Sequence, residues 1–225
     1  YLQHGMGEDR RAWPNQGRTN FILDNLIAEG RAKPMIIVME DGGIARGFET
    51  PIRDKSGKIL PRPQGQGPGR RGGPGQGPNF WDEFTETMIT DVIPAVDEHF
   101  RTLTDRENRA IAGLSLGGTQ TYQISQANLD KFANIGILSA PFGFPGIETG
   151  YNGLLAKPGE FNKLVKVFFI SMGSKEGPNT GRTIHETLDK AGIKNVYYEA
   201  PGTAHEFQTW RKSLYYFAQL LFQNK

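Results

Sequence analysis

The sequence predicts an α/β protein with a mostly parallel sheet and helices on both faces. Short apolar runs alternate along the chain with longer stretches of helical periodicity. The runs lack strict alternation of polar and apolar residues, which is typical of strands that are covered on both faces. Alternating strands and helices indicate βαβ units, whose strands are parallel and whose crossovers are right-handed. At 225 residues, the chain is expected to form one domain, residues 1–225.

The predicted strands come first. Tyr1–Gly5 has the pattern of a buried strand that ends in a turn, and a sheet seldom begins so abruptly. We therefore expect the first strands of the sheet to precede this chain. The later apolar runs of strand length are Met35–Met39, Ala110–Leu114, Ile135–Leu138, Val167–Met172 and Val196–Glu199.

The predicted helices carry apolar residues three and four positions apart, the spacing of one buried helix face. They lie between the strands, and the last one follows the final strand. Their ranges are Thr19–Ala28, Asp82–Phe100, Gly118–Leu129, Thr183–Ala191 and Glu206–Phe222.

The composition excludes several classes of function. The 26 Lys and Arg residues nearly balance the 24 Asp and Glu residues, so the basic excess that nucleic-acid binding needs is missing. The uninterrupted apolar runs, Val167–Ile170 among them, are much shorter than the roughly 20 residues of a membrane helix. We therefore expect neither a nucleic-acid nor a membrane partner. Because the sequence has no Cys, it excludes disulfides, thiolate zinc sites and a Cys nucleophile.

Residues 41–79 form a Gly/Pro/Arg-rich insertion. Its second half, Pro61–Asn79, has seven Gly, five Pro, three Arg and no acidic residue. Such a segment forms neither a helix nor a central strand, which favours a surface excursion. Because the insertion follows the predicted strand Met35–Met39, we also expect it at the carboxyl edge of the sheet, where open parallel sheets bind ligands.

The segment Gly113–Gly117 matches the pattern G-x-S-x-G. A predicted strand precedes it and a predicted helix follows it, which is the context of a nucleophile elbow in an α/β-hydrolase fold. The tight turn lifts a serine hydroxyl to the carboxyl edge of the sheet, at the start of a helix. Ser115 is therefore the predicted nucleophile.

A serine nucleophile needs a base, and the chain has four histidines. His99 and His185 lie in predicted helices, and His4 lies in the first turn, where we expect it to stabilise the turn. His205 directly follows the strand Val196–Glu199, at the same edge of the sheet as the serine. We predict that His205 is the general base, and that activity falls in acid as its imidazole becomes protonated.

An acid must hold the base in one tautomer, and in α/β-hydrolases it lies between the serine and the histidine in the chain. Glu176 follows the strand Val167–Met172 and is the first candidate. Glu148 follows the preceding strand and is the second. The sequence leaves the choice between them open.

An oxyanion hole needs two backbone N–H groups close to the nucleophile. Leu116, the residue after the serine, is expected to supply one and Met6, after the first strand, the other. Three further residues are candidate substrate contacts. They are Gln120, Phe142 and Trp81, the last of which is alternatively a core residue at a helix start.

Three motifs together carry a family resemblance: His4–Gly7, Gly113–Gly118 and Gly202–Phe207. With them the chain resembles the esterase D-like α/β-hydrolases and, among these, the feruloyl and acetyl-xylan esterases of carbohydrate esterase family 1. The similarity runs over nearly the whole chain and includes Trp210–Leu214. The family usually has Asp at the position of Glu176, whose side chain reaches one methylene further.

The resemblance implies a serine esterase with a Ser–acid–His triad that needs neither a metal nor an organic cofactor. It implies that the substrate is an acylated plant polysaccharide or oligosaccharide, with feruloyl or other hydroxycinnamoyl groups on arabinoxylan as the first expectation. It also implies a secreted or periplasmic protein, attached in its full length to xylanase or carbohydrate-binding modules.

Other functions would use the same residues. An acetyl-xylan esterase, an S-formylglutathione or siderophore esterase, or an acyltransferase would each need the same triad. A carbohydrate-binding relict domain would instead bind xylan without hydrolysing it.

Overall fold

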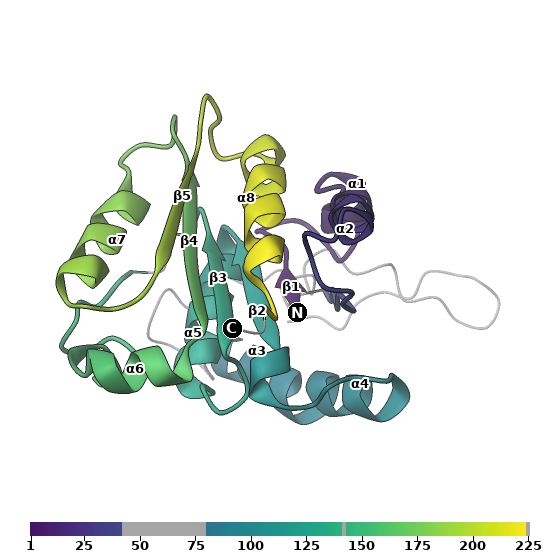
Figure 1. Cartoon of the computed structure of the whole chain (residues 1–225), viewed down its shortest axis with the longest axis horizontal. Coiled ribbons are helices and arrows are strands. Elements are labelled where there is room, and N and C mark those ends of the chain that lie inside the picture. The colour runs from purple at the N-terminus through teal and green to yellow at the C-terminus, as the bar shows by residue number, and fades with distance from the viewer. Residues whose placement is uncertain (42–79, 141–142, 224–225) are drawn as a thin grey trace, which may run out of the picture.

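The computed structural model describes residues 1–41, 80–140 and 143–223, with side chains from residue 84 onward in the second range. Within these ranges the strands form one fully parallel sheet in the order β1-β2-β3-β4-β5 (Figure 1). The strands are β1 (Leu2–Gln3), β2 (Ala110–Leu114), β3 (Asn134–Leu138), β4 (Val167–Gly173) and β5 (Val196–Ala200). Consecutive strands are neighbours, so all carboxyl ends meet along one edge. The predicted α/β architecture is confirmed.

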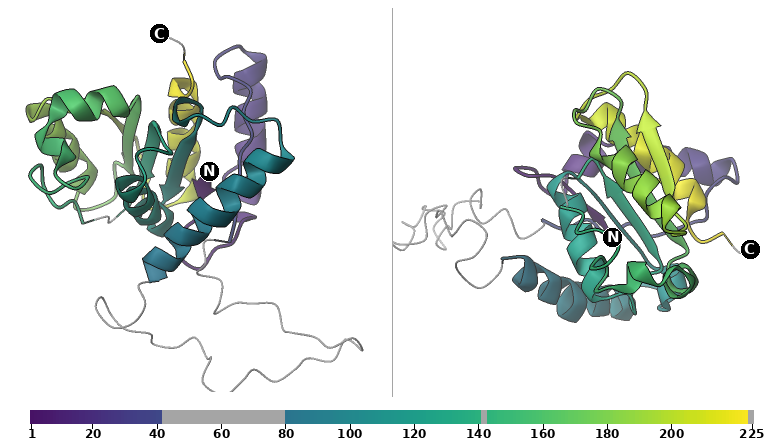
Figure 2. Two further views of the ribbon diagram at one scale, coloured as in Figure 1. Left: turned by 90° about the horizontal axis from the view of Figure 1, so that it is seen from below. Right: turned by 90° about the vertical axis from the view of Figure 1, so that its left-hand side faces the viewer.

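Helices connect the strands and cover the sheet. They are α1 (Ala12–Asn15), α2 (Thr19–Ala28), α3 (Phe80–Thr87), α4 (Ile93–His99), α5 (Leu116–Ala127), α6 (Pro158–Leu164), α7 (Thr180–Lys190) and α8 (Phe207–Leu220). A π-helical turn, Met88–Val92, joins α3 to α4, so the three segments form one long helical stretch (Figure 2). None of the helices in the described ranges combines the length and hydropathy that a membrane crossing requires.

Alternate residues of the strands contribute to two hydrophobic cores, one on each face of the sheet. Ile111 and Phe168 face one side of the sheet, where they pack with residues of α3, α4, α5, α6 and α7. Leu114 and Phe169 face the other side, where they pack with α1 and α8. Helix α2 lies outside α8 and packs on it through Leu26 (Figure 1). Burial on both faces explains why the strands show no polar alternation.

One predicted strand is wrong. Met35–Met39 is not a strand in the structure, although it lies beside β1 and the Leu2 N–H donates to the Val38 carbonyl (2.9 Å). A strand needs a continuous ladder of hydrogen bonds, and this segment makes one such bond with β1. Except for its first residue, Asp41, the predicted insertion 41–79 lies outside the described residues.

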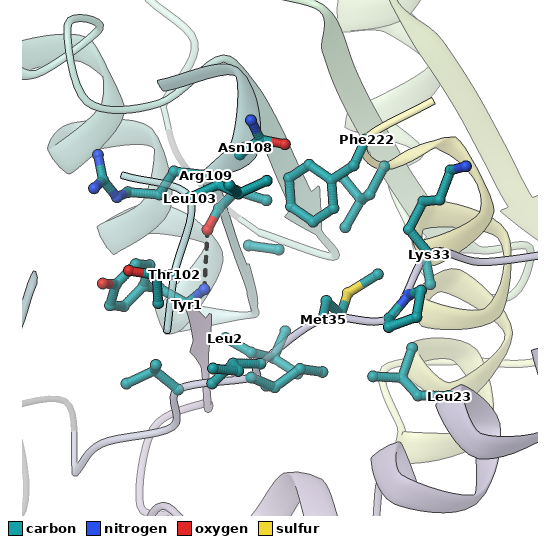
Figure 3. A pocket seen from close by; sticks show the side chains of 18 of the residues that line it. Tyr1, Leu2, Leu23, Lys33, Met35, Thr102, Leu103, Asn108, Arg109 and Phe222 are labelled. Atoms are coloured by element: carbon teal, nitrogen blue, oxygen red, sulfur yellow. Dashed lines mark hydrogen bonds between the residues drawn. The ribbon is translucent and has the colours of Figure 1, made fainter. Parts of the chain in front are cut away.

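A pocket of about 860 Å³ lies beside β1, near the start of β1 and β2. Its lining is mainly apolar and includes Leu23, Met35, Leu103 and Phe222 (Figure 3). This pocket belongs to the amino ends of the strands. The predicted residues Ser115, Glu176 and His205 follow the carboxyl ends of β2, β4 and β5 and do not line it.

Candidate active site

The turn between β2 and α5 holds Ser115 in an unusual backbone conformation. Its φ is 53° and its ψ is −119°, values that a residue with a side chain rarely adopts. The turn is possible because its neighbours are glycines: a Cβ at Gly113 would collide with the backbone of Gly117, and one at Gly117 with the His4 carbonyl. This geometry is the strained strand-to-helix elbow that the G-x-S-x-G pattern predicts.

Three predicted residues come together at the carboxyl edge of the sheet. The His205 Nε2 atom lies 2.9 Å from the Ser115 hydroxyl oxygen. The His205 Nδ1 atom lies 2.8 Å from the Glu176 carboxylate oxygen Oε2. The side chain of His205 is 48% exposed, whereas that of Glu176 is 6% exposed. The imidazole therefore lies between a hydroxyl and a buried carboxylate, within hydrogen-bond distance of both.

The Glu176 carboxylate is held by two further donors. Its Oε1 atom accepts hydrogen bonds from the backbone N–H of Gly173 and from the hydroxyl of Ser139, both at 2.7 Å. Burial, the largest single influence, raises the pKa of Glu176. The hydrogen bonds from His205, Gly173 and Ser139 together outweigh it, so the pKa is lower than that of an ordinary glutamic acid. The carboxyl group is consequently held in its charged form.

Backbone hydrogen bonds join the loop that carries Glu176 to the loop that carries His205. The Ser174 N–H donates to the Ala200 carbonyl and the Lys175 N–H to the Thr203 carbonyl, each at 2.9 Å. The Gly202 N–H donates to the Ser174 hydroxyl at 2.8 Å. These bonds extend the pairing of β4 and β5 beyond the strands, so the two loops keep a defined spacing.

The loop after β1 lies against the elbow. A Cβ at Gly5 would be 3.5 Å from the Cβ of Ser115, so the predicted oxyanion segment is beside the nucleophile. The carboxylate of Glu8 accepts a hydrogen bond from the Gly5 N–H (2.8 Å), which fixes this turn. Within the described residues, the Met6 and Leu116 N–H groups donate to no loop or side-chain acceptor, as the predicted oxyanion hole requires.

Among the described residues, Ser115 is hydrogen-bonded to no histidine other than His205. His4 is buried, and its Nδ1–H donates to the Gly5 carbonyl (2.8 Å), so it stabilises the first turn as predicted. His99 contacts the Ala95 carbonyl on α4, and His185 stacks on Tyr197 beside α7. Among the described residues, no group of three His, Asp or Glu side chains could hold a metal ion.

The remaining candidates lie outside this cluster or outside the described residues. Glu148 is exposed in the turns that follow β3, whereas His205 Nδ1 is paired with Glu176. Gln120 is buried on α5, so its predicted contact with a substrate stays a prediction. Trp81 lies on α3 with its side chain outside the described residues, and Phe142 lies outside them altogether.

Sequence reasoning missed Ser139. It follows Leu138, whose partner in the register of β2 and β3 is Leu114, the residue before Ser115. The signal that could have found it is therefore positional: a small polar residue directly after a central strand, level with the nucleophile.

Comparisons with known proteins identify the family of this chain. The Esterase family model, described as "Putative esterase", matches residues 1–222. An endo-1,4-beta-xylanase/feruloyl esterase from Xylanibacter ruminicola is 37% identical in an alignment of 225 residues that covers 99% of this chain and 26% of that protein. The chain spans about a quarter of the length of the curated relatives it matches.

Solved structures show the same fold. A CE1 ferulic acid esterase from Anaeromyces mucronatus, in complex with ferulic acid, has a TM-score of 0.71 at 24% identity, covering 99% of this chain and 78% of that one. The feruloyl esterase module from Clostridium thermocellum, complexed with sinapinate, has a TM-score of 0.64 at 20% identity, covering 99% and 76%. The fold of this chain is therefore that of the α/β-hydrolases.

Proposed function

This chain belongs to the esterase family, and we propose that it is a serine esterase that removes feruloyl or related hydroxycinnamoyl groups from plant cell-wall polysaccharide. The observation that carries the proposal is the chain of contacts from Ser115 through His205 to Glu176. The substrate rests on the relatives: one is named as both xylanase and feruloyl esterase, and a second was solved with ferulic acid.

In the first half of the reaction, Ser115 attacks the carbonyl carbon of the ester. His205 takes the hydroxyl proton through Nε2, and the Glu176 carboxylate keeps the Nδ1–H of the imidazole directed toward itself. The N–H groups of Leu116 and Met6 bind the oxygen that becomes negative in the tetrahedral intermediate. His205 then gives the proton to the sugar oxygen, which leaves as an alcohol.

In the second half, water replaces the alcohol. His205 removes a proton from the water, which attacks the acyl-serine, and the carboxylic acid leaves as Ser115 regains its proton. Every step uses acid–base chemistry of this chain and the two N–H groups. Esters of plant cell walls lie outside microbial cells, so we infer that the enzyme acts there, as a secreted or periplasmic protein.

The test is hydrolysis of methyl ferulate, p-nitrophenyl acetate and feruloylated arabinoxylan, each with the Ser115→Ala variant as control. We expect ferulate release from the methyl ester and from the polysaccharide, lost in the variant. Turnover of the acetate ester alone would contradict the hydroxycinnamoyl substrate and leave the serine assignment intact. Binding of arabinoxylan without turnover of any ester would contradict the esterase.

A further inference from the structure

We propose that Ser139 is a positioning residue, whose hydroxyl holds the Glu176 carboxylate in the orientation that aligns His205. The inference rests on the proposed triad and adds a fourth residue to it. Four neighbouring strands each supply one side chain to the carboxyl edge of the sheet. They are Ser115 after β2, Ser139 after β3, Glu176 in the turn after β4 and His205 after β5.

The contact between Ser139 and Glu176 is short and buried. The hydroxyl of Ser139 donates to Glu176 Oε1 at 2.7 Å, and Ser139 is only 3% exposed. Its backbone is fixed as well, because its N–H donates to the Ser171 carbonyl at 2.7 Å and so continues the pairing of β3 with β4. The donor is thus held by the pairing of β3 with β4, within the sheet and not on the loop that carries the acid.

The backbone of Ser139 indicates that the hydroxyl is needed there. Its φ is 48°, in the left-handed region where glycine and asparagine are more usual than serine. Residues in this region persist where the surrounding structure determines them, and they gather at functional sites. Here the turn directs a hydroxyl from the end of β3 to an acid on the neighbouring loop.

The chemistry of a glutamate explains what a second donor adds. Glu176 has one more rotatable bond than an aspartate, so more contacts are needed to hold its carboxylate in one place. Oε2 faces the imidazole, and Oε1 receives the Gly173 N–H and the Ser139 hydroxyl. With Ser139 removed, one fixed donor to Oε1 remains, and the carboxylate is free to turn away from His205.

The first test replaces the hydroxyl in two ways, with p-nitrophenyl acetate as substrate. Ser139→Ala removes the hydroxyl. Ser139→Gly also removes the hydroxyl and favours the positive φ, so this variant avoids the backbone strain that alanine would carry at this position. Both variants are expected to lose about tenfold or more in kcat, the usual effect of a lost hydrogen bond to a charged group. KM should stay close to that of the wild type in both variants, and the melting temperature should fall no further in Ser139→Gly than in Ser139→Ala.

The second test asks whether Ser139 acts through the acid. Combined with Glu176→Ala, the Ser139→Gly substitution should cost less than twofold, because the group that it positions is gone. An equal loss in both backgrounds would overturn the proposal and indicate a structural role. Wild-type kcat in both Ser139 variants would overturn it too, while an inactive Ser115→Ala would leave the triad standing. An active Ser115→Ala would overturn the triad and, with it, this inference.

Discussion

The two ends of the sheet differ in what they offer a substrate. At the carboxyl end, His205 lies within hydrogen-bond distance of both Ser115 and Glu176, and backbone hydrogen bonds join the loops that carry His205 and Glu176. At the amino end, a pocket of about 860 Å³ has a mainly apolar lining that includes none of these residues. From this comparison we infer that the proposed chemistry is located by the convergence of strand ends and not by the size of a pocket.

The substitution with the largest expected effect on kcat/KM distinguishes the two ends of the sheet. Ser115→Ala should lower kcat/KM by about 10⁴-fold or more, because no other group can take the place of the nucleophile. Leu103 is an exposed residue of the amino-end pocket, and Leu103→Ala should change kcat/KM less than twofold. Steady-state kinetics with p-nitrophenyl acetate measures both. Comparable losses in the two variants would break the distinction between the ends.

The next effect concerns the two candidate acids. Glu176→Ala should lower kcat by about 10³-fold or more, because the imidazole loses the group that holds its tautomer. Glu148→Ala serves as the matched control, since Glu148 is an exposed glutamate on the loop of the neighbouring strand. Its kcat should stay within twofold of the wild type. Equal losses would leave the acid unassigned.

A glycine pair tests the packing of the elbow. Gly117→Ala places a Cβ against the backbone of His4 and should destabilise the protein by about 1–3 kcal/mol, with a loss of activity. Gly159→Ala adds the same methyl group in α6, where nothing beyond the chain neighbours and the helix backbone lies within 4 Å of it, and should leave stability equal or higher. Urea unfolding compares the two variants. A Gly117→Ala protein as stable as the wild type would show that the elbow has room.

The smallest expected effect is on the free energy of unfolding at acid pH. Because the folded-state pKa of Glu176 lies below its unfolded value, the unfolded protein binds more protons as the pH falls. The stabilisation is present above the ordinary glutamate pKa of about 4.3 and is lost below it. Glu176→Gln should therefore flatten the fall in unfolding free energy between about pH 5 and pH 3. Identical slopes in urea titrations would contradict the depressed pKa.

Much of the fold could be predicted because apolar runs of strand length alternate with helical periodicity along the chain. The helix at Thr19–Ala28 has the predicted bounds, and β2 and the start of α5 flank Ser115 as the motif requires. Met35–Met39 has an equally apolar run and is not a strand, because pairing depends on a neighbour that the run itself does not reveal. Helix α6 was missed because its seven residues are too few for a clear period.

Each residue of the candidate site could be predicted only as far as the sequence around it carried a signal. Ser115 has a motif, and His205 could be found among four histidines by its place after a strand. Glu176 and Glu148 looked alike because both follow strands, and only the course of the loops separates them in space. Ser139 has no motif at all, since its role depends on the register of β3 with its neighbours.

The most direct test of the central claim, that Ser115 is the nucleophile, is covalent labelling. The folded protein is treated with a fluorophosphonate, digested and sequenced by mass spectrometry. We expect one stoichiometric adduct on Ser115, strongly slowed in His205→Ala and absent in Ser115→Ala. An adduct on another residue, or equally fast labelling of Ser115 without His205, would contradict the account.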